Sequence, residues 1–416
     1  MSKRKIRILI ISGTLETSLH PVPPVADGAP EWNVFRLVEA AARNPDSYLD
    51  IHVISPCESG QFPALQHYSV VNRHKYHHVV FLPQHLSLYR NFLRHLLPLR
   101  LLARRLMKLP DLMSWWYLRQ IKPVLKDISP HIVFINARPQ YIRYLRPLVL
   151  PGRLWFFMRG EMGESRRYLN FLDGIVVNSD GMRAYLQEFI GDEGPVIYKM
   201  PNTLGDEFDI PEPIENRFLR REKTILFAGR LIPDKGVMEL LEAFELVKQQ
   251  IPDVRLVICG ASINAPQGDM KTPYEHVLRR KVASMQAGES VHFTGYVPNK
   301  DLGKYYVDAN VVIFPSLCKE SFGMVALEAM RCGTPVVASR QPGFEELIAP
   351  GENGFLVDDP RNAQSLASAI LSILQDSKLA QNMGRIGRER SLNYVPEKAL
   401  FALENIVQDY YSEELV

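Results

Sequence analysis

Short apolar runs alternate with longer amphipathic segments along this 416-residue chain, and the alternation occurs twice. The first series of expected strands covers 5–12, 50–55, 131–136, 154–158, 174–178 and 196–201. The second series covers 224–229, 255–260, 291–294 and 311–314. Strands that alternate with helices predict a parallel sheet covered on both faces. The sequence therefore predicts an α/β fold of two Rossmann-like domains.

A polar stretch with two prolines, 202–223, separates the two series and reads as a linker. We place the first domain at 1–204 and the second at 205–395. The segment that follows, 396–416, is predicted to begin with a helix over Pro396 to Tyr411.

Composition excludes several classes of protein. With 46% hydrophobic residues, 23% charged residues and a net charge of +3, the chain resembles an ordinary globular protein and is not expected to bind nucleic acid. Its four cysteines form no C-x-x-C pair, which favours a reducing, cytoplasmic compartment. The apolar run 6–12 is too short for a signal sequence, and no run approaches the roughly 20 apolar residues of a membrane span.

Charge is unevenly distributed, because 59–110 contains no Asp or Glu but several arginines and six of the 11 histidines. Within it, leucines alternate with arginines over Leu86 to Lys108, interrupted by Pro98. Two interpretations stay open. The segment lies in an anionic membrane interface, or it forms a core helix pair with a solvated basic face.

The run His74-Lys75-Tyr76-His77-His78 is rich in imidazole but contains no carboxylate or cysteine. We interpret it as a surface loop rather than a metal site.

The stretch from Lys319 to Ser339 holds two carboxylates, Glu320 and Glu328, eight residues apart. We expect a loop over 315–321, a helix from about Phe322 to Cys332, a glycine stop and a buried strand. If that helix included both carboxylates, they would stand roughly 12 Å apart along its axis. That spacing is too wide for a shared proton and suits two contacts on an elongated ligand. Gly323 would let an anion approach the free N–H groups at the helix start.

Two cations follow the first strand of the second series, in Gly229-Arg230-Leu231 and Lys235-Gly236. Arginine offers a fork of donors to phosphate oxygens, and lysine offers a point charge. Fixed cations in such a turn would stabilise the charge of a leaving diphosphate.

Together these segments resemble the E-x7-E and G-R-L…K-G elements of the retaining GT-B glycosyltransferases of family 4, the glycosyl transferases group 1. The resemblance is specific from Leu226 to Val357 and diffuse before Gly205. It implies a GT-B fold, in which two Rossmann-like domains face each other across a cleft. The first domain would bind the acceptor and the second the donor, and the terminal helix would pack back on the first domain.

The resemblance also implies an activity. A retaining, metal-independent enzyme would move a hexose from a nucleotide sugar to a hydroxyl of an acceptor. A UDP-sugar is the favoured donor and a GDP-sugar the next. The basic first domain points to a saccharide or lipid-linked acceptor, in cell-surface polysaccharide or glycolipid assembly, at the inner face of the plasma membrane. No Asp-x-Asp motif occurs, so neither a metal nor another cofactor is expected.

The resemblance assigns roles residue by residue. Arg230 and Lys235 would bind the diphosphate, Glu320 the sugar hydroxyls and Glu328 the ribose. The implied donor-binding residues are Gly229, Gly260, Gly295, Tyr296, Ser321, Phe322, Gly323, Met324, Val325 and Glu328.

The first domain departs from the family pattern. Asp27-Gly28 stands where the family usually carries Gly-Gly, and Arg159-Gly160-Glu161 stands where many relatives have a histidine. Contact with the acceptor or cleft and an ordinary loop or strand-end role remain equally open for these positions. The residues concerned are Gly28, Asn136, Arg138, Arg159 and Glu161.

Other classes fit less well. A phosphorylase with pyridoxal phosphate would need a dedicated lysine and a longer chain, and a nucleotide-sugar epimerase should lack the two combined motifs. A non-catalytic nucleotide-sugar binder should have lost Arg230, Lys235 or Glu320, and all three are present. The oligomeric state is not predicted.

If the basic segment contacts a membrane, then Arg104→Gln combined with Arg105→Gln should reduce co-sedimentation with anionic liposomes at low salt. Each cation near such a surface contributes about 1 kcal/mol. Unchanged co-sedimentation would exclude the membrane interpretation.

Overall fold

The computed structural model describes residues 5–12, 29–58, 75–81, 112–136, 139–158, 163–191, 194–209, 217–219, 222–260 and 273–411. These residues divide into two compact units. Unit 1 comprises 1–177, 183–200 and 396–416, and unit 2 comprises 178–182 and 201–395. The amphipathic segment 86–108 lies outside the described residues. None of the described helices is long and apolar enough to cross a membrane.

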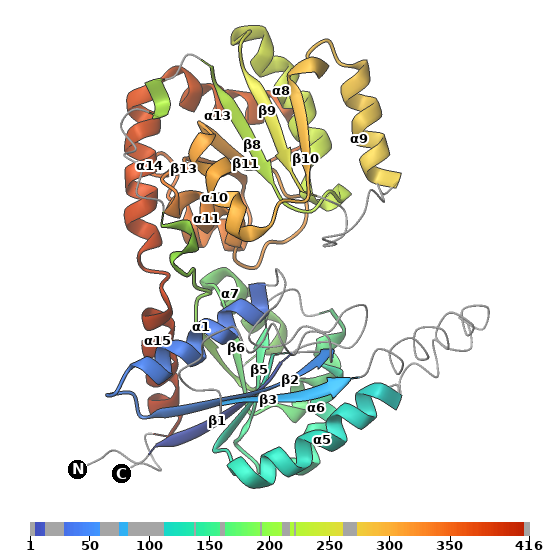
Figure 1. Cartoon of the computed structure of the whole chain (residues 1–416), viewed down its shortest axis with the longest axis vertical. Coiled ribbons are helices and arrows are strands. Elements are labelled where there is room, and N and C mark those ends of the chain that lie inside the picture. The colour runs from blue at the N-terminus through green and yellow to red at the C-terminus, as the bar shows by residue number, and fades with distance from the viewer. Residues whose placement is uncertain are drawn as a thin grey trace, which may run out of the picture. The chain divides into compact units, whose positions relative to one another are not determined.

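Unit 1 is built on a seven-stranded parallel sheet, flanked by helices (Figure 1). Its strand order is β3-β2-β1-β4-β5-β6-β7. The strands are β1 (Ile6–Ser12), β2 (Leu49–Glu58), β3 (Tyr76–Phe81), β4 (Ile132–Asn136), β5 (Leu154–Met158), β6 (Gly174–Val177) and β7 (Val196–Lys199). Among the described residues, the α-helices of unit 1 are α1 (Ala29–Arg43), α5 (Leu112–Ile128), α6 (Gln140–Leu145), α7 (Asp180–Ile190), whose first turn belongs to unit 2, and α15 (Pro396–Tyr411).

Unit 2 is built on a six-stranded parallel sheet of order β10-β9-β8-β11-β12-β13. Its strands are β8 (Thr224–Ala228), β9 (Arg255–Cys259), β10 (Val291–Gly295), β11 (Val311–Phe314), β12 (Val336–Ser339) and β13 (Gly354–Val357). Its helices are α8 (Val237–Gln250), α9 (Pro273–Ser284), α10 (Asn299–Asp308), α11 (Met324–Arg331), α12 (Pro342–Leu347), α13 (Ala363–Gln375) and α14 (Ser377–Ser391). The predicted α/β class with two parallel sheets is confirmed.

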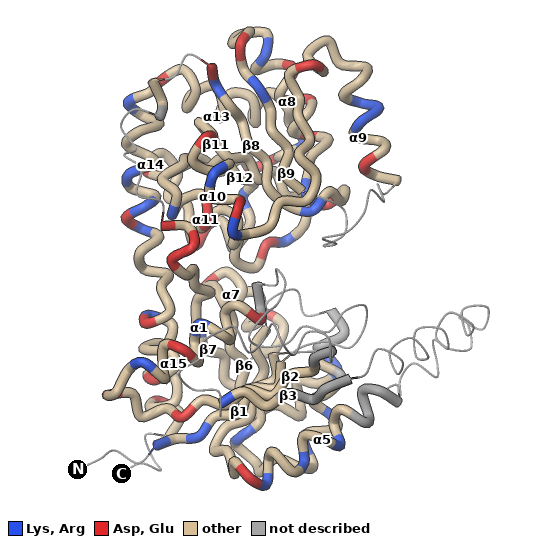
Figure 2. Tube along the Cα trace, in the orientation of Figure 1, with Lys and Arg blue, Asp and Glu red and all other residues tan. Residues whose placement is uncertain are grey.

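Alternation along the strands of unit 2 explains why both faces of its sheet are covered. In β11, Val311 and Ile313 belong to one apolar cluster, with α8 and α13. Val312 and Phe314 belong to the other, with α10, α11 and α12. Successive side chains of a strand point to opposite faces, so a strand that is apolar at every position must be covered twice. Lys, Arg, Asp and Glu accordingly gather on the helices and strand ends, and the strands themselves are nearly uncharged (Figure 2).

Helix α15 completes unit 1, although it is separated in sequence from the rest of that unit. It lies beside α1 (Figure 1), and its Leu400, Leu403 and Val407 enter the same core cluster as β1. The Tyr411 hydroxyl donates to the carbonyl of His131, at 3.1 Å. The Tyr410 ring meets Trp155 edge-on, with centroids 4.8 Å apart.

The interpretation of 74–78 as a surface loop is wrong, because β3 begins at Tyr76 and pairs with β2 over Val53 to Glu58. The buried Tyr76 hydroxyl donates to Glu39, at 2.8 Å. His77 Nε2 lies 3.3 Å from His52 Nδ1. Pairing with a distant strand overrides the polar composition that suggested a loop. The described residues contain no cluster of three or more potential metal ligands.

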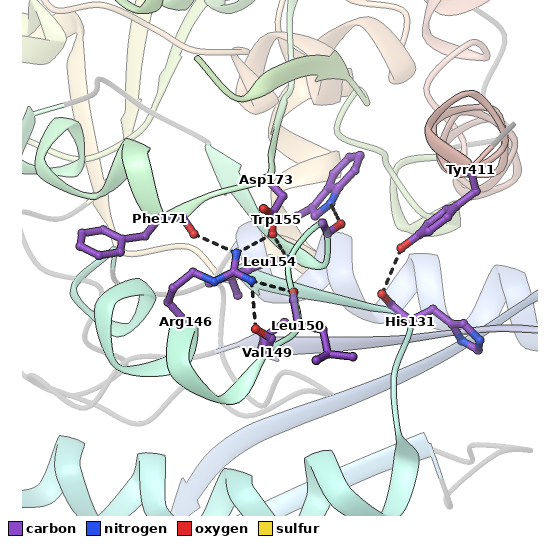
Figure 3. A network of polar contacts seen from close by, with 10 residues as sticks. His131, Arg146, Val149, Leu150, Leu154, Trp155, Phe171, Asp173 and Tyr411 are labelled. Carbon is purple, nitrogen blue, oxygen red and sulfur yellow. Dashed lines mark hydrogen bonds and ion pairs between the residues drawn. The ribbon is translucent and has the colours of Figure 1, made fainter. Parts of the chain in front are cut away.

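Arg146 ties together the connection between α6 and β5 (Figure 3). Its guanidinium donates to Asp173 at 2.6 Å and to the carbonyls of Val149 and Leu150 at 2.9 and 2.6 Å. Asp173 also accepts from the backbone N–H of Leu154, at 2.8 Å. One half-buried cation therefore fixes a turn to the start of a central strand.

Replacing this cation tests that account. Arg146→Ala should lower the free energy of unfolding of unit 1 by about 2 kcal/mol, because several hydrogen bonds to a charged group are lost. All four tryptophans of the chain lie before residue 177, so their fluorescence in urea reports on unit 1. Exposed Arg143 is the matched control, and Arg143→Ala should change the midpoint little. Equal effects of the two changes would contradict the assignment.

Candidate functional site

The loops that follow β8 and β11 meet beyond the carboxyl ends of these strands in the second sheet. These strands are neighbours in the middle of the sheet, with β9 and β10 on one side and β12 and β13 on the other. The chain thus reverses its direction of winding between β8 and β11. In open parallel sheets, ligands bind outside the carboxyl ends of the strands at such a switch point.

The two loops are in close backbone contact. The N–H of Leu317 donates to the carbonyl of Asp234, at 2.8 Å. Gly236 has φ +69°, and a Cβ on it would stand 1.9 Å from the carbonyl oxygen of Pro315. Only glycine combines a left-handed conformation with so close an approach.

This contact brings together two residues that the motifs predicted. Lys235 Nζ forms an ion pair and hydrogen bond with Glu320 Oε1. Ser316 Oγ donates to the same carboxylate oxygen, at 3.1 Å. The Lys235 and Glu320 side chains are 19% and 18% exposed, so the pair remains accessible to a ligand. Arg230 is exposed, and its guanidinium has no hydrogen-bond or ion-pair partner among the described residues, although its carbonyl accepts from the N–H of Ile232.

The expected helix over 322–332 is wrong at its start. Helix α11 begins at Met324, after Gly323 with φ +86°. Glu320 therefore lies in the loop, where its carbonyl accepts from the N–H of Gly343, at 2.8 Å. The 12 Å separation assumed a helix containing both carboxylates and does not apply. The left-handed Gly323 sets this boundary, because its backbone conformation cannot continue a right-handed helix and a Cβ on it would stand 2.6 Å from the ring of Phe344.

Glu328 lies on α11 and is 5% exposed. Its Oε2 accepts from the hydroxyl of Tyr306 on α10, at 2.8 Å. Burial, followed by the nearby negative charge of Glu328, raises the pKa of Tyr306 well above its usual value. The tyrosine therefore stays a hydrogen-bond donor to the carboxylate.

The remaining predicted donor-binding residues line the ends of neighbouring strands. Gly229 N–H donates to Cys259 at 3.0 Å, and Gly260 N–H donates to Gly295 at 2.9 Å. A Cβ on Gly260 would stand 1.8 Å from the carbonyl oxygen of Gly229. Because glycines stand at the ends of β8, β9 and β10, these residues place no side chain over the backbone at the carboxyl ends of the strands. Tyr296, Ser321, Met324 and Val325 are half-buried beside this edge or at the start of α11.

The first-domain predictions are mostly outside the described residues, where Gly28, Arg138, Arg159 and Glu161 all fall. Asn136 is described, at the end of β4, and its amide donates to Ser12 Oγ at 3.1 Å. Tyr117 donates to the carbonyl of Ser12, also at 3.1 Å. Strands β1 and β4 are neighbours where the winding of the first sheet reverses, so Asn136 occupies the position in unit 1 that corresponds to the loops described above.

Sequence reasoning missed Ser316 and Tyr306. Ser316 follows a strand in an ordinary turn, and Tyr306 fits the apolar face of α10. Neither position carries a recognisable pattern, because Tyr306 contacts a residue on another helix and Ser316 contacts a residue four positions later in an irregular loop.

Comparisons with known proteins agree with this geometry. Residues 211–390 match the model of the family described as glycosyl transferases group 1. A D-inositol 3-phosphate glycosyltransferase of Corynebacterium glutamicum is 32% identical over 196 residues, 47% of this chain and 45% of the relative. A GDP-mannose-dependent alpha-(1-6)-phosphatidylinositol monomannoside mannosyltransferase of Mycolicibacterium smegmatis is 29% identical over 241 residues, 55% of this chain and 60% of the relative. The aligned part is thus about half the length of these curated relatives.

A likeness in structure extends over nearly the whole chain. The crystal structure of Anabaena HepE in complex with UDP and glucose matches with a TM-score of 0.66, covering 98% of this chain and 100% of HepE, at 17% identity. The fold is therefore that of the GT-B glycosyltransferases. The sequence match to the glycosyl transferases group 1 extends over residues 211–390, which include β8, the Lys235–Glu320 pair and α11.

Two glycine variants distinguish the effect of the close contact between the loops on stability from the effect of backbone strain. Gly236→Ala and Gly295→Ala both place a side chain at positive φ, which costs roughly 1–2 kcal/mol. A Cβ on Gly295 meets nothing within 4 Å, whereas one on Gly236 meets Pro315. Gly236→Ala should therefore lower the melting temperature further, and a crystal structure should show Lys235 displaced from Glu320. Equal melting temperatures would contradict the close loop contact.

Proposed function

We propose that this protein is a retaining glycosyltransferase that moves a hexose from a nucleotide sugar to a hydroxyl group of an acceptor. One observation carries the proposal. A lysine and a carboxylate from loops after neighbouring strands meet at the switch point of the second sheet, beside an exposed arginine.

The cations would bind the diphosphate of the donor. Lys235 and Arg230 follow β8, and α8 begins immediately after Gly236. The N-terminus of a helix carries a partial positive charge and free N–H groups, which favour an anion. Since the leaving diphosphate gains negative charge as the sugar departs, these fixed positive groups stabilise the transition state more than the ground state. These groups supply the positive charge that a bound metal ion would otherwise supply to the diphosphate, so we propose that transfer is independent of a metal.

The carboxylates would orient the donor. Glu320, partly exposed beside Lys235, would accept hydrogen bonds from sugar hydroxyls next to the diphosphate. Glu328, further along α11, would accept from the ribose. When a donor binds, phosphate would replace Glu320 as the partner of Lys235, and sugar hydroxyls would replace Lys235 as partners of Glu320. Each charge would thereby keep a partner, which limits the cost of desolvation.

Retention requires the new bond to form on the face from which the diphosphate leaves. The bond between the anomeric carbon and the phosphate oxygen breaks, and a bond from that carbon to the acceptor oxygen forms. The acceptor proton passes to an oxygen of the departing phosphate. Neither Glu320 nor Glu328 acts as the nucleophile.

The substrates are proposed from chemistry and from similarity. A UDP-hexose is the first choice of donor, since the HepE structure, one of those similar to this chain, contains UDP and glucose. A GDP-sugar is the second, since the name of the mycobacterial relative states GDP-mannose. The names of the relatives contain inositol phosphate and phosphatidylinositol mannoside, which supports a role in cell-surface glycolipid or polysaccharide assembly. We place the protein in the cytoplasm, peripherally at the inner face of the plasma membrane.

Lys235→Ala should reduce transfer from UDP-glucose or GDP-mannose at least 100-fold, because the fixed charge on the leaving group is lost. The melting temperature without ligand should fall, because Glu320 loses its partner, but the fold should stay intact. The rise in melting temperature on adding UDP or GDP should shrink. Lys304, with its side chain 80% exposed on α10, is the control, and Lys304→Ala should behave like the unchanged protein.

Transfer or hydrolysis of the donor by Lys235→Ala at the rate of the unchanged protein would overturn the diphosphate assignment. Absence of any nucleotide-dependent rise in melting temperature in the unchanged protein would overturn the proposed function itself.

A further inference from the structure

Each carboxylate of the E-x7-E pair accepts a hydrogen bond from a buried hydroxyl of unit 2. Ser316 lies in the same loop as Glu320, and Tyr306 lies on helix α10, which packs beside α11. Ser316 is 3% exposed and donates to Glu320, at 3.1 Å. Tyr306 is 0% exposed and donates to Glu328, at 2.8 Å. Neither hydroxyl belongs to the motifs that identify the site.

Ser316 is itself held in place by the sheet. It follows the carboxyl end of β11, and its carbonyl accepts from Ser339 Oγ at the end of β12, at 2.8 Å. Lys235 and Ser316 both contact Oε1 of Glu320. Among the described residues, Oε2 of Glu320 has no hydrogen-bond partner. The carboxylate is therefore fixed through one oxygen, and the other is left to meet a ligand.

Tyr306 is also held in place by contacts with other parts of unit 2. Its carbonyl accepts from Thr334 Oγ1, at 2.6 Å, and its ring lies 6.1 Å from that of Phe208. The side chain belongs to the core cluster that joins α10 to α11. Its hydroxyl is thus delivered to Glu328 by packing rather than by a mobile loop.

We propose that Ser316 and Tyr306 are positioning residues that hold Glu320 and Glu328 in the orientation that meets the donor. The inference rests on the proposed function, and it adds two residues that act only through the carboxylates. Hydrogen bonds to charged groups contribute more than neutral ones, and a carboxylate without its donor rotates or loses alignment. Ser316 would act on the sugar end of the donor and Tyr306 on the nucleoside end.

The two positions should therefore differ in what they affect. Ser316→Ala should lower kcat for transfer from the nucleotide sugar about tenfold and change the Kd for the free nucleoside diphosphate less than twofold. Tyr306→Phe, which removes only the hydroxyl, should raise the Kd for the nucleoside diphosphate about tenfold. The measurements are calorimetry with UDP and with GDP, and transfer from UDP-glucose and GDP-mannose.

Two controls test whether general loosening of the core explains the losses. Ser391→Ala removes a buried hydroxyl that donates to the carbonyl of Arg388, and Tyr394→Phe removes one that donates to the carbonyl of Glu346. Both controls should keep kcat and Kd within twofold. Losses in the controls equal to those in Ser316→Ala and Tyr306→Phe would overturn the proposal.

Double-mutant cycles give the decisive test. Tyr306→Phe should have no further effect on nucleotide binding when Glu328→Gln is already present, and Ser316→Ala none on kcat when Glu320→Gln is present. Additive effects would show that the hydroxyls act independently of the carboxylates and would overturn the inference alone. If the unchanged protein binds neither UDP nor GDP, the proposed function fails and this inference fails with it.

Discussion

The ion pair between Lys235 and Glu320 joins two loops whose residues are 85 positions apart in sequence. It exists because β8 and β11 are parallel neighbours, so the loops that follow their carboxyl ends lie next to each other at the same end of the sheet. The backbone bond between Leu317 and Asp234 and the glycine at 236 bring the loops close enough for the side chains to meet. A half-buried cation and a half-buried anion would each be costly alone, and each removes the cost of the other. Ligand binding would exchange these partners, so that neither Lys235 nor Glu320 is left without one.

The rest of the site follows from the same sheet. Glycines at the ends of β8, β9 and β10 leave backbone exposed beside the ion pair, and α11 continues from the loop that carries Glu320. The first sheet has the same order of winding, and Asn136 bonds to Ser12 where its winding reverses. Each unit thus offers polar groups at its own switch point. In the proposed function, the second unit binds the donor and the first the acceptor.

Much of this arrangement could be predicted from the sequence. The apolar runs located most strands of both sheets, because buried parallel strands are apolar at every position. The two motifs located Lys235 and Glu320, which the structure brings into contact. Strand β3 was missed because its pairing with β2 is not a local property, and the start of α11 was placed two residues early although Gly323 was visible as a helix boundary. Ser316 and Tyr306 could not have been found, because a buried serine or tyrosine reads as core until its partner is known.

The most direct test of the central claim is a crystal structure of the protein with a bound nucleotide sugar. The account predicts that Lys235 Nζ leaves Glu320 and lies within hydrogen-bond distance, about 3 Å, of a phosphate oxygen. Glu320 should then accept from hydroxyls of the sugar. A bound nucleotide sugar with the ion pair between Lys235 and Glu320 intact, or one bound away from the ends of β8 and β11, would contradict it.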